Sequence, residues 1–211
     1  DQAETAYNQL RSAGFTNISL DLMYGLPNQS LQQWNATLEK VLRMAPEHIS
    51  LYCLTLEHGT PMEYQVRVGK LAKPDDDLAA DMYDLAEKLL GEEGYKQYEI
   101  SNWAQPDRSS KHNLVYWKNG SYVGVGPGAH SSLNNHRFSN LNSPRQYISK
   151  LTSTKTHNYQ PWEKLNKEKL HELPFIGDIE VLEKNIQMGE TMMLGLRLNE
   201  GIYLDSFNQR F

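Results

Sequence analysis

The segment KHNLVYWKNGSYVGVGPGAHS, Lys111–Ser131, holds the most distinctive combination of residues in the chain. It contains His112 and His130, three large aromatic residues, and the glycine-rich run Gly124–Gly128. Glycine has no Cβ, so a strand with glycine at alternate positions lets a flat ligand or another chain approach closely. Pro127 has no N–H to donate and therefore ends such a strand. Two interpretations follow: the wall of a binding site, or a tightly packed, bulged strand.

Upstream of this segment, helical and strand patterns alternate along the chain. Three strands are expected, at Asn17–Tyr24, Ile49–Leu56 and Tyr95–Ser101. The residues before each of them repeat apolar side chains at helical spacing. Such alternation indicates parallel strands joined by right-handed crossover helices. The sequence therefore predicts an α/β layer or barrel, with too few strands to close a barrel.

Two carboxylates are expected on the polar face of these strands. The two-residue period of a strand puts Asp21 opposite three aliphatic side chains, and Glu99 opposite Tyr98 and Ile100. In a barrel such side chains point into the mouth, where α/β barrels keep their chemistry. A buried carboxylate also serves as a structural partner of an arginine or a backbone amide. The pattern favours function for Asp21 and a structural role for Glu99.

After Ser131 the pattern changes to polar turns, followed by a short helix at 144–150. Thr152–Pro174 is polar with little periodicity, which indicates a linker or surface wrap. Asp178–Leu196 has helical spacing with methionines on its apolar face, and Asp205 is expected to cap a last helix. The sequence thus predicts three parts: 1–131 as part of the α/β domain, 132–175 as linker and surface wrap, and 176–211 as the start of a small helical domain.

Composition excludes several classes of protein. The net charge is −5 and the isoelectric point is near 5.8, which disfavours nucleic acid as a partner. No apolar run is as long as a transmembrane helix and no charged-then-apolar leader opens the sequence, so a cytoplasmic protein is expected. The single cysteine, Cys53, excludes an internal disulfide and cannot alone hold an iron–sulfur cluster. A first residue that is not methionine, Asp1, suggests a fragment of a longer protein.

Other chemical motifs are weak. The histidines show no paired H-x-x-x-H spacing, so a zinc site is not indicated. No serine stands in G-x-S-x-G, and Cys53 is expected inside a buried strand, so a hydrolase is not indicated either. Pro127 interrupts the glycine run, which therefore does not match a dinucleotide fingerprint. What remains is a surface suited to a large planar ligand, with a histidine able to ligate iron.

Several motifs, in order along the chain, carry a resemblance to a known family. They are DLMYGLPNQS (21–30), ISLYCLTLEHGTP (49–61), YEISNWA (98–104), HNLVYW (112–117), GVGPGAHS (124–131) and ETMMLGLRL (190–198). Together they resemble the oxygen-independent coproporphyrinogen III oxidase-like radical SAM family, and most of all its haem-chaperone branch. The resemblance implies the second half of a radical SAM (β/α)6 partial barrel, followed by a small, mostly helical, winged-helix-like C-terminal domain.

The same resemblance implies the cofactors. Family members bind a 4Fe–4S cluster through a cysteine trio near the first strand, and the cluster binds and cleaves S-adenosylmethionine. This sequence has no such trio, so the cluster ligands are expected outside these residues, and the fragment alone is expected to be inactive. No catalytic residue is assigned.

The resemblance also implies site residues. Asp21, Cys53 and His130 fall at positions that contact S-adenosylmethionine in the family. The oxidases lack a histidine matching His130, which favours the chaperone branch. In that branch the H-N-x-x-Y-W segment is associated with haem, which here means His112, Asn113, Tyr116 and Trp117, with His112 as a candidate iron ligand. Simpler roles remain open: a loop histidine bonded to its neighbours, core aromatics, and a His130 that holds the glycine segment.

Three functions are therefore expected in order. The first is part of a radical SAM haem chaperone that binds haem and S-adenosylmethionine and delivers haem to acceptor proteins. The second is an oxygen-independent coproporphyrinogen III oxidase, which decarboxylates propionates oxidatively. The third is a structural module that packs on the other half-barrel and binds no ligand. An uncovered sheet edge also predicts self-association or partial disorder at the Ile18 strand.

Overall fold

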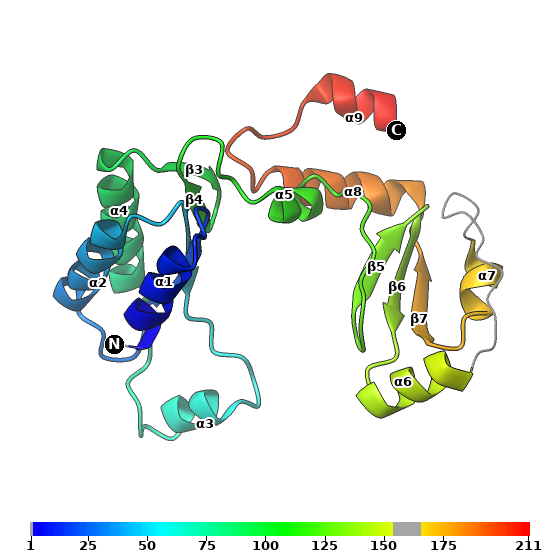
Figure 1. The fold of residues 1–211 in the computed structure, drawn as a ribbon, viewed down its shortest axis with the longest axis horizontal. Helices are drawn as coiled ribbons and strands as arrows, with labels where there is room; N and C mark the ends of the chain where they lie inside the picture. The colour runs from blue at the N-terminus through cyan, green and yellow to red at the C-terminus, as the bar shows by residue number, and fades with distance from the viewer. Residues whose placement is uncertain (1, 154–165) are drawn as a thin grey trace. The chain divides into compact units, whose positions relative to one another are not determined.

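The computed structural model describes residues 2–153 and 166–211 (Figure 1). By its contacts the chain forms two compact units, Asp1–Ser110 and Lys111–Phe211. The expected division at residue 131 stays a prediction about the complete protein. Much of the expected linker, 154–165, lies outside the described residues.

The first unit is a four-stranded sheet with helices. In chain order its elements are α1 (Gln2–Ser12), β1 (Ser19–Tyr24), α2 (Leu31–Met44), β2 (His48–Cys53), α3 (Pro61–Arg67), α4 (Asp76–Glu92), β3 (Lys96–Glu99) and β4 (Asn102–Ala104). The strand order is β1-β2-β4-β3. β1 and β2 are parallel, as predicted. β4 is antiparallel to both of its neighbours, so the predicted all-parallel pairing is wrong at this edge.

The antiparallel strand arises where one long strand was expected over Tyr95–Ser101. The chain turns after Glu99, and the Glu99 carboxylate accepts a hydrogen bond from the backbone N–H of Ser101 at 3.1 Å. This local bond favours a turn over a continued strand. β4 then returns along β3 and enters the sheet between β3 and β2.

The core of the first unit lies between one face of the sheet and helices α2 and α4. Trp34, Leu38, Ile49, Met82 and Leu90 are all fully buried there. The Trp34 Nε1–H also donates to the backbone carbonyl of Met82 at 2.8 Å, which links the two helices. The aliphatic residues predicted to face inward from these helices therefore form the core together with the alternate residues of β2.

Helix ends in the first unit follow their capping residues. Ser30 and Gln33 form the predicted capping box at the start of α2. Asp75 caps α4 and accepts from two backbone N–H groups of its first turn. The short helix α3, which Thr60 caps, was not expected, because none of its residues is buried and no apolar stripe marks it.

The second unit is a three-stranded antiparallel sheet with helices. Its elements are α5 (Lys111–Trp117), β5 (His130–Leu133), β6 (His136–Asn140), α6 (Pro144–Ser153), α7 (Lys167–His171), β7 (Ile176–Val181), α8 (Lys184–Gly195) and α9 (Leu204–Arg210), and the strand order is β5-β6-β7. Arg137 of β6 donates to both carboxylate oxygens of Glu190, at 2.9 and 2.8 Å, which fastens α8 to the sheet.

Three expectations for this unit were wrong in detail. The polar turns after Ser131 are a hairpin, in which Asn134 and Asn135 take φ of 48° and 62°, the conformation of a two-residue type I′ turn. Residues 178–181 belong to β7 and not to a helix, so the predicted helix begins only at Lys184. Leu170 of α7 is almost fully buried, in a region expected to be a surface wrap.

Candidate functional site

A row of polar residues crosses the whole sheet of the first unit. The strand register pairs Asp21 with Ser50, Ser50 with Asn102, and Asn102 with Glu99. Paired residues of neighbouring strands point to the same face of a sheet. Asp21 and Glu99, the two carboxylates expected on one face, are thus the two ends of one row. Sequence reasoning did not find Ser50 and Asn102 between them.

The two ends of this row differ in exposure. Asp21 is exposed on the edge strand β1, whereas Glu99 is fully buried. The Glu99 carboxylate is occupied by the Ser101 N–H and by the side-chain amide of Asn102. The remaining amide oxygen of Asn102 is buried without a hydrogen-bond partner among the described residues. Asp21 is therefore the carboxylate of the row that is open to a ligand, and Glu99 shapes the turn.

A buried histidine that the sequence did not single out lies one step along from this row. His48 Nδ1 is 2.8 Å from the Ser19 hydroxyl, and its Nε2 is 2.8 Å from the Tyr98 hydroxyl. Burial lowers the pKa of His48, and the nearby carboxylate of Asp21 opposes that shift. His48 is therefore a neutral imidazole that ties β1, β2 and β3 together.

The depressed pKa of His48 predicts acid sensitivity of the first unit. Below the ordinary pKa of 6.5, the unfolded chain takes up a proton at His48 that the folded chain does not. The free energy of unfolding is thus expected to fall as the pH falls from 6.5 towards the lowered pKa. Urea titrations at several pH values should show this fall, and His48→Gln should flatten it. The exposed His58→Gln serves as control; an equal slope in wild type and His48→Gln would refute the assignment.

Cys53 is the last residue of β2 and is exposed, so the prediction of a buried cysteine in mid-strand is wrong. The aliphatic run that suggested a longer strand continues past Cys53, but the strand ends there. Its Sγ lies beside Gly25, where an added Cβ would come within 3.3 Å of the sulfur. Burial raises the pKa of the Cys53 thiol, and burial raises the pKa of the neighbouring Tyr24 to about 12. Both groups are therefore neutral at physiological pH.

In the second unit, α5 places the H-N-x-x-Y-W residues on two faces. His112 and Tyr116 are four residues apart and meet: the Tyr116 hydroxyl is 3.0 Å from His112 Nε2, and the rings stand edge to face with centroids 5.0 Å apart. Tyr122 packs edge to face on Tyr116 at 4.7 Å. Both His112 and Tyr116 are exposed.

Trp117 lies on another face of α5. The Arg197 guanidinium lies 5.0 Å from the centre of its ring, a cation–π contact. Asn113, four residues before Trp117, shares that side of the helix by the same periodicity. The motif therefore separates into an exposed pair, His112 and Tyr116, and a half-buried pair, Asn113 and Trp117.

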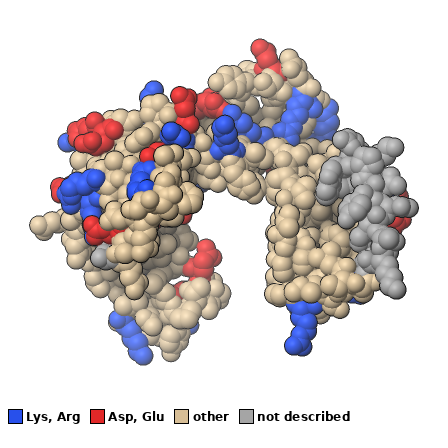
Figure 2. All heavy atoms as spheres, in the orientation of Figure 1, with Lys and Arg blue, Asp and Glu red and all other residues tan. Residues whose placement is uncertain are grey.

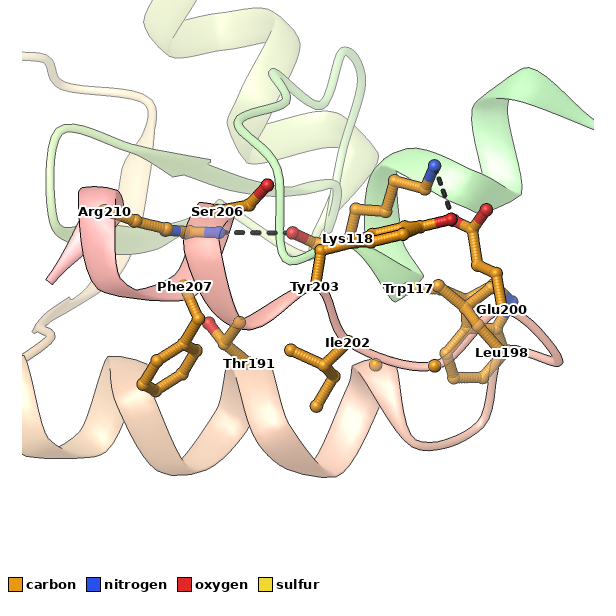
Figure 3. Close-up of a pocket in the computed structure, with 12 residues that line it drawn as sticks. Trp117, Lys118, Thr191, Leu198, Glu200, Ile202, Tyr203, Ser206, Phe207 and Arg210 are labelled. Carbon is orange, nitrogen blue, oxygen red and sulfur yellow. Dashed lines mark hydrogen bonds and ion pairs between the residues drawn. The ribbon is translucent and has the colours of Figure 1, made fainter.

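Trp117 also lines a cavity of about 250 Å³ (Figure 3). Its other lining residues come from the end of α5, from α8 and α9, and from the turn between them: Lys118, Thr191, Gly195, Leu198, Glu200, Gly201, Ile202, Tyr203, Ser206, Phe207 and Arg210. A Lys118–Glu200 ion pair of 2.8 Å lies at one end. At the other, Arg210 donates to the backbone carbonyls of Lys118 and Asn119 at 3.2 and 2.6 Å.

The glycine segment packs against the neighbouring strand. A Cβ at Gly124 would collide with the carbonyl oxygen of His130, and the Gly124 N–H donates to the Ser131 hydroxyl at 3.0 Å. The Asn140 amide donates to the Gly126 carbonyl at 2.8 Å. Close packing therefore explains Gly124, as the second interpretation of this segment expected. The His130 ring is exposed at the start of β5.

The structure thus brings the predicted residues together in two groups. Asp21 and Cys53 belong to the first unit, and the other predicted residues belong to the second. Within residues 2–153 and 166–211, no three His, Cys, Asp or Glu side chains are arranged to hold a metal ion. None of the helices in these ranges combines the length and apolar character of a membrane span. Acidic and basic side chains are interspersed over the face of the first unit seen in Figure 2.

Comparison with known proteins connects both units to one family. A model of the HemN C-terminal domain matches residues 182–211. The chain is 35% identical over 210 residues to the haem chaperone HemW of Lactococcus lactis, covering all of this chain and 50% of that protein. It is 33% identical over 207 residues to HemW of Bacillus subtilis, covering 98% of this chain and 50% of that protein. The chain therefore spans about half the length of the curated relatives it matches.

A solved structure agrees with these relatives. Coproporphyrinogen III oxidase (HemN) from Escherichia coli, described as a radical SAM enzyme, superposes with a TM-score of 0.67 at 17% identity, covering 98% of this chain and 46% of the other. This likeness concerns the fold, and it confirms the predicted mixed α/β class with partial sheets and helices. Over the half of these proteins that it spans, the chain belongs to the oxygen-independent coproporphyrinogen III oxidase-like radical SAM family.

Proposed function

We propose that the chain is part of a radical SAM haem chaperone, which binds haem and S-adenosylmethionine and delivers haem to acceptor proteins. The observation that supports this most is the exposed His112 imidazole on α5, flanked by the rings of Tyr116 and Tyr122. The relatives named haem chaperone HemW cover this part of the chain.

The residues of α5 fit a haem group by their chemistry. An imidazole supplies an axial nitrogen to haem iron, and aromatic edges and faces suit a flat macrocycle. His112 would hold the iron, with Tyr116 and Tyr122 beside it. Trp117 is already packed by Arg197 and lines the cavity of Figure 3, so it would support α5 from behind. When bound, the haem is the cargo and supplies no chemistry to this chain.

Asp21 fits the role proposed for it towards S-adenosylmethionine. That molecule carries an ammonium group and ribose hydroxyls, all hydrogen-bond donors, and an ionised carboxylate is purely an acceptor. Asp21 is exposed at the open end of the polar row. Cys53, at the end of the adjacent strand β2, and His130, in the second unit, are proposed as further contacts. The cysteine ligands of a 4Fe–4S cluster are proposed to lie outside these 211 residues, which contain one cysteine.

Asp21→Asn in the complete protein is expected to weaken S-adenosylmethionine binding roughly tenfold or more, because hydrogen bonds to a charged group contribute more than neutral ones. Equilibrium dialysis with labelled S-adenosylmethionine measures this. Asp81→Asn, which changes an exposed carboxylate on α4 of the same unit, is the matched control. Equal affinity in wild type and Asp21→Asn would remove Asp21 from the site.

Two anaerobic assays separate the chaperone from its alternative. The complete protein, loaded with haem, is expected to transfer haem to a haem-free acceptor protein, followed by the absorbance of the acceptor. Conversion of coproporphyrinogen III to protoporphyrinogen would instead favour the oxidase. No haem and no S-adenosylmethionine bound by the complete protein would favour a structural module. Cytoplasmic location and association through the edge strand β1 also remain proposals; in the structure β1 is formed, and Ile18 beside it is buried.

A further inference from the structure

We propose that the Tyr116 hydroxyl masks the iron-binding nitrogen of His112, so that haem must displace a hydrogen bond when it binds. This inference rests on the proposed function, in which His112 holds haem iron. It adds a residue that limits haem affinity, which suits a protein that must release its cargo.

The pair is set up by the geometry of α5. His112 and Tyr116 are separated by four residues, about one helical turn, so their side chains lie on the same face. The Tyr116 hydroxyl stands 3.0 Å from His112 Nε2, and the two rings are at 86° to each other. The hydroxyl therefore meets the imidazole at its edge, where the nitrogen lone pair or its proton lies.

Tyr122 holds Tyr116 in this position from outside the helix. The two tyrosine rings pack edge to face at 4.7 Å. Tyr122 is itself fixed, because its backbone N–H and C=O both pair with Ser132 of β5 at 2.9 Å. It is also partly buried, which raises the pKa of its hydroxyl. The His112–Tyr116 contact is thus braced by the sheet and does not depend on α5 alone.

The nitrogen that Tyr116 contacts is the one that haem iron needs. Nδ1 of an imidazole adjoins the ring carbon that carries Cβ, so a macrocycle as wide as porphyrin would meet the side chain of its own ligand there. Nε2 has no such neighbour. Whether Nε2 accepts the tyrosine proton or donates its own, it offers no free lone pair while the bond to Tyr116 persists. Binding therefore breaks the His112–Tyr116 hydrogen bond, forms an Nε2–iron bond, and leaves the exposed hydroxyl of Tyr116 to water.

Tyr116→Phe in the complete protein tests this inference. The variant keeps the ring that packs on His112 and Tyr122 and removes only the hydroxyl. Because one hydrogen bond no longer has to be broken, haem is expected to bind about two- to tenfold more tightly. Titration with ferric haem, followed at the Soret band, measures the affinity. Tyr64→Phe, which removes an exposed hydroxyl from α3, is the matched control and should leave the affinity unchanged.

The double variant His112→Ala/Tyr116→Phe completes a cycle. The gain from Tyr116→Phe should vanish when His112 is absent. Unchanged or weaker binding by Tyr116→Phe, or the same gain without His112, would overturn the masking role while leaving haem binding by His112 intact. If His112→Ala alone binds haem as well as wild type, the proposed function fails at this residue, and the masking role fails with it.

Discussion

Replacing His112 by alanine in the complete protein is expected to weaken haem binding on the order of a hundredfold. The estimate follows from the cost of losing groups that merely orient a metal ligand, which is already about 10- to 100-fold. The imidazole is exposed on α5, so its removal leaves no cavity in the core and should not unfold the second unit. Titration with ferric haem, followed by absorbance, gives the affinity directly.

The matched control is His58→Ala. His58 is also exposed and follows β2 in the first unit. Its loss should leave haem affinity as it is in wild type. If His112→Ala and His58→Ala bind haem equally well, His112 is not the ligand, and the motif H-N-x-x-Y-W contributes to this protein in another way.

Trp34→Ala is expected to destabilise the first unit by about 3–5 kcal/mol, as truncations of large buried aromatic residues do. Trp34 is fully buried between α2 and α4, packs against Tyr24 with ring centroids 5.5 Å apart, and donates to the Met82 carbonyl. Its loss removes apolar contacts and leaves that carbonyl without its donor. Urea unfolding, followed by circular dichroism, measures the change in the free energy of unfolding.

Trp34→Phe separates the two contributions. It keeps most of the ring and loses the Nε1–H, so a smaller loss of about 1–3 kcal/mol is expected for the unpaired carbonyl and the lost ring volume. A Trp34→Ala protein as stable as wild type would contradict the core described for the first unit, because the residue would then not be packed between the helices.

The elements with strong local signals were predictable from the sequence. The alternation of Ile18, Leu20 and Leu22 with polar residues predicted β1, and the Ser30–Gln33 capping box predicted the start of α2. Asp75 and its neighbours predicted α4 in the same way. These features depend on contacts between residues close together in the chain, which a sequence pattern displays directly.

Elements that tertiary contacts determine were missed. α5 has seven residues, none of them buried, and it lies in a segment whose glycines suggested a strand. β4 depends on pairing with β2, some fifty residues away along the chain by the register of Ile49 with Trp103. Asn134 and Asn135 did carry a usable signal, since adjacent asparagines favour the left-handed φ of a type I′ turn.

The candidate site was predictable to a similar extent. Asp21 was identified from its place in a strand, but its row partners Ser50 and Asn102 required the register between strands. The contact between His112 and Tyr116 follows from a four-residue separation once the segment is known to be helical. His48 carried no sequence signal, because only the fold brings Ser19 and Tyr98 to its two ring nitrogens.

The central claim, that the exposed imidazole of α5 is the haem-iron ligand, is tested most directly by chemical rescue. The complete protein with His112→Gly is titrated with haem in the presence and absence of free imidazole, and the Soret spectrum is compared with that of wild type. The account predicts a spectrum altered by the substitution and restored by imidazole. A His112→Gly spectrum that matches wild type without imidazole would contradict it.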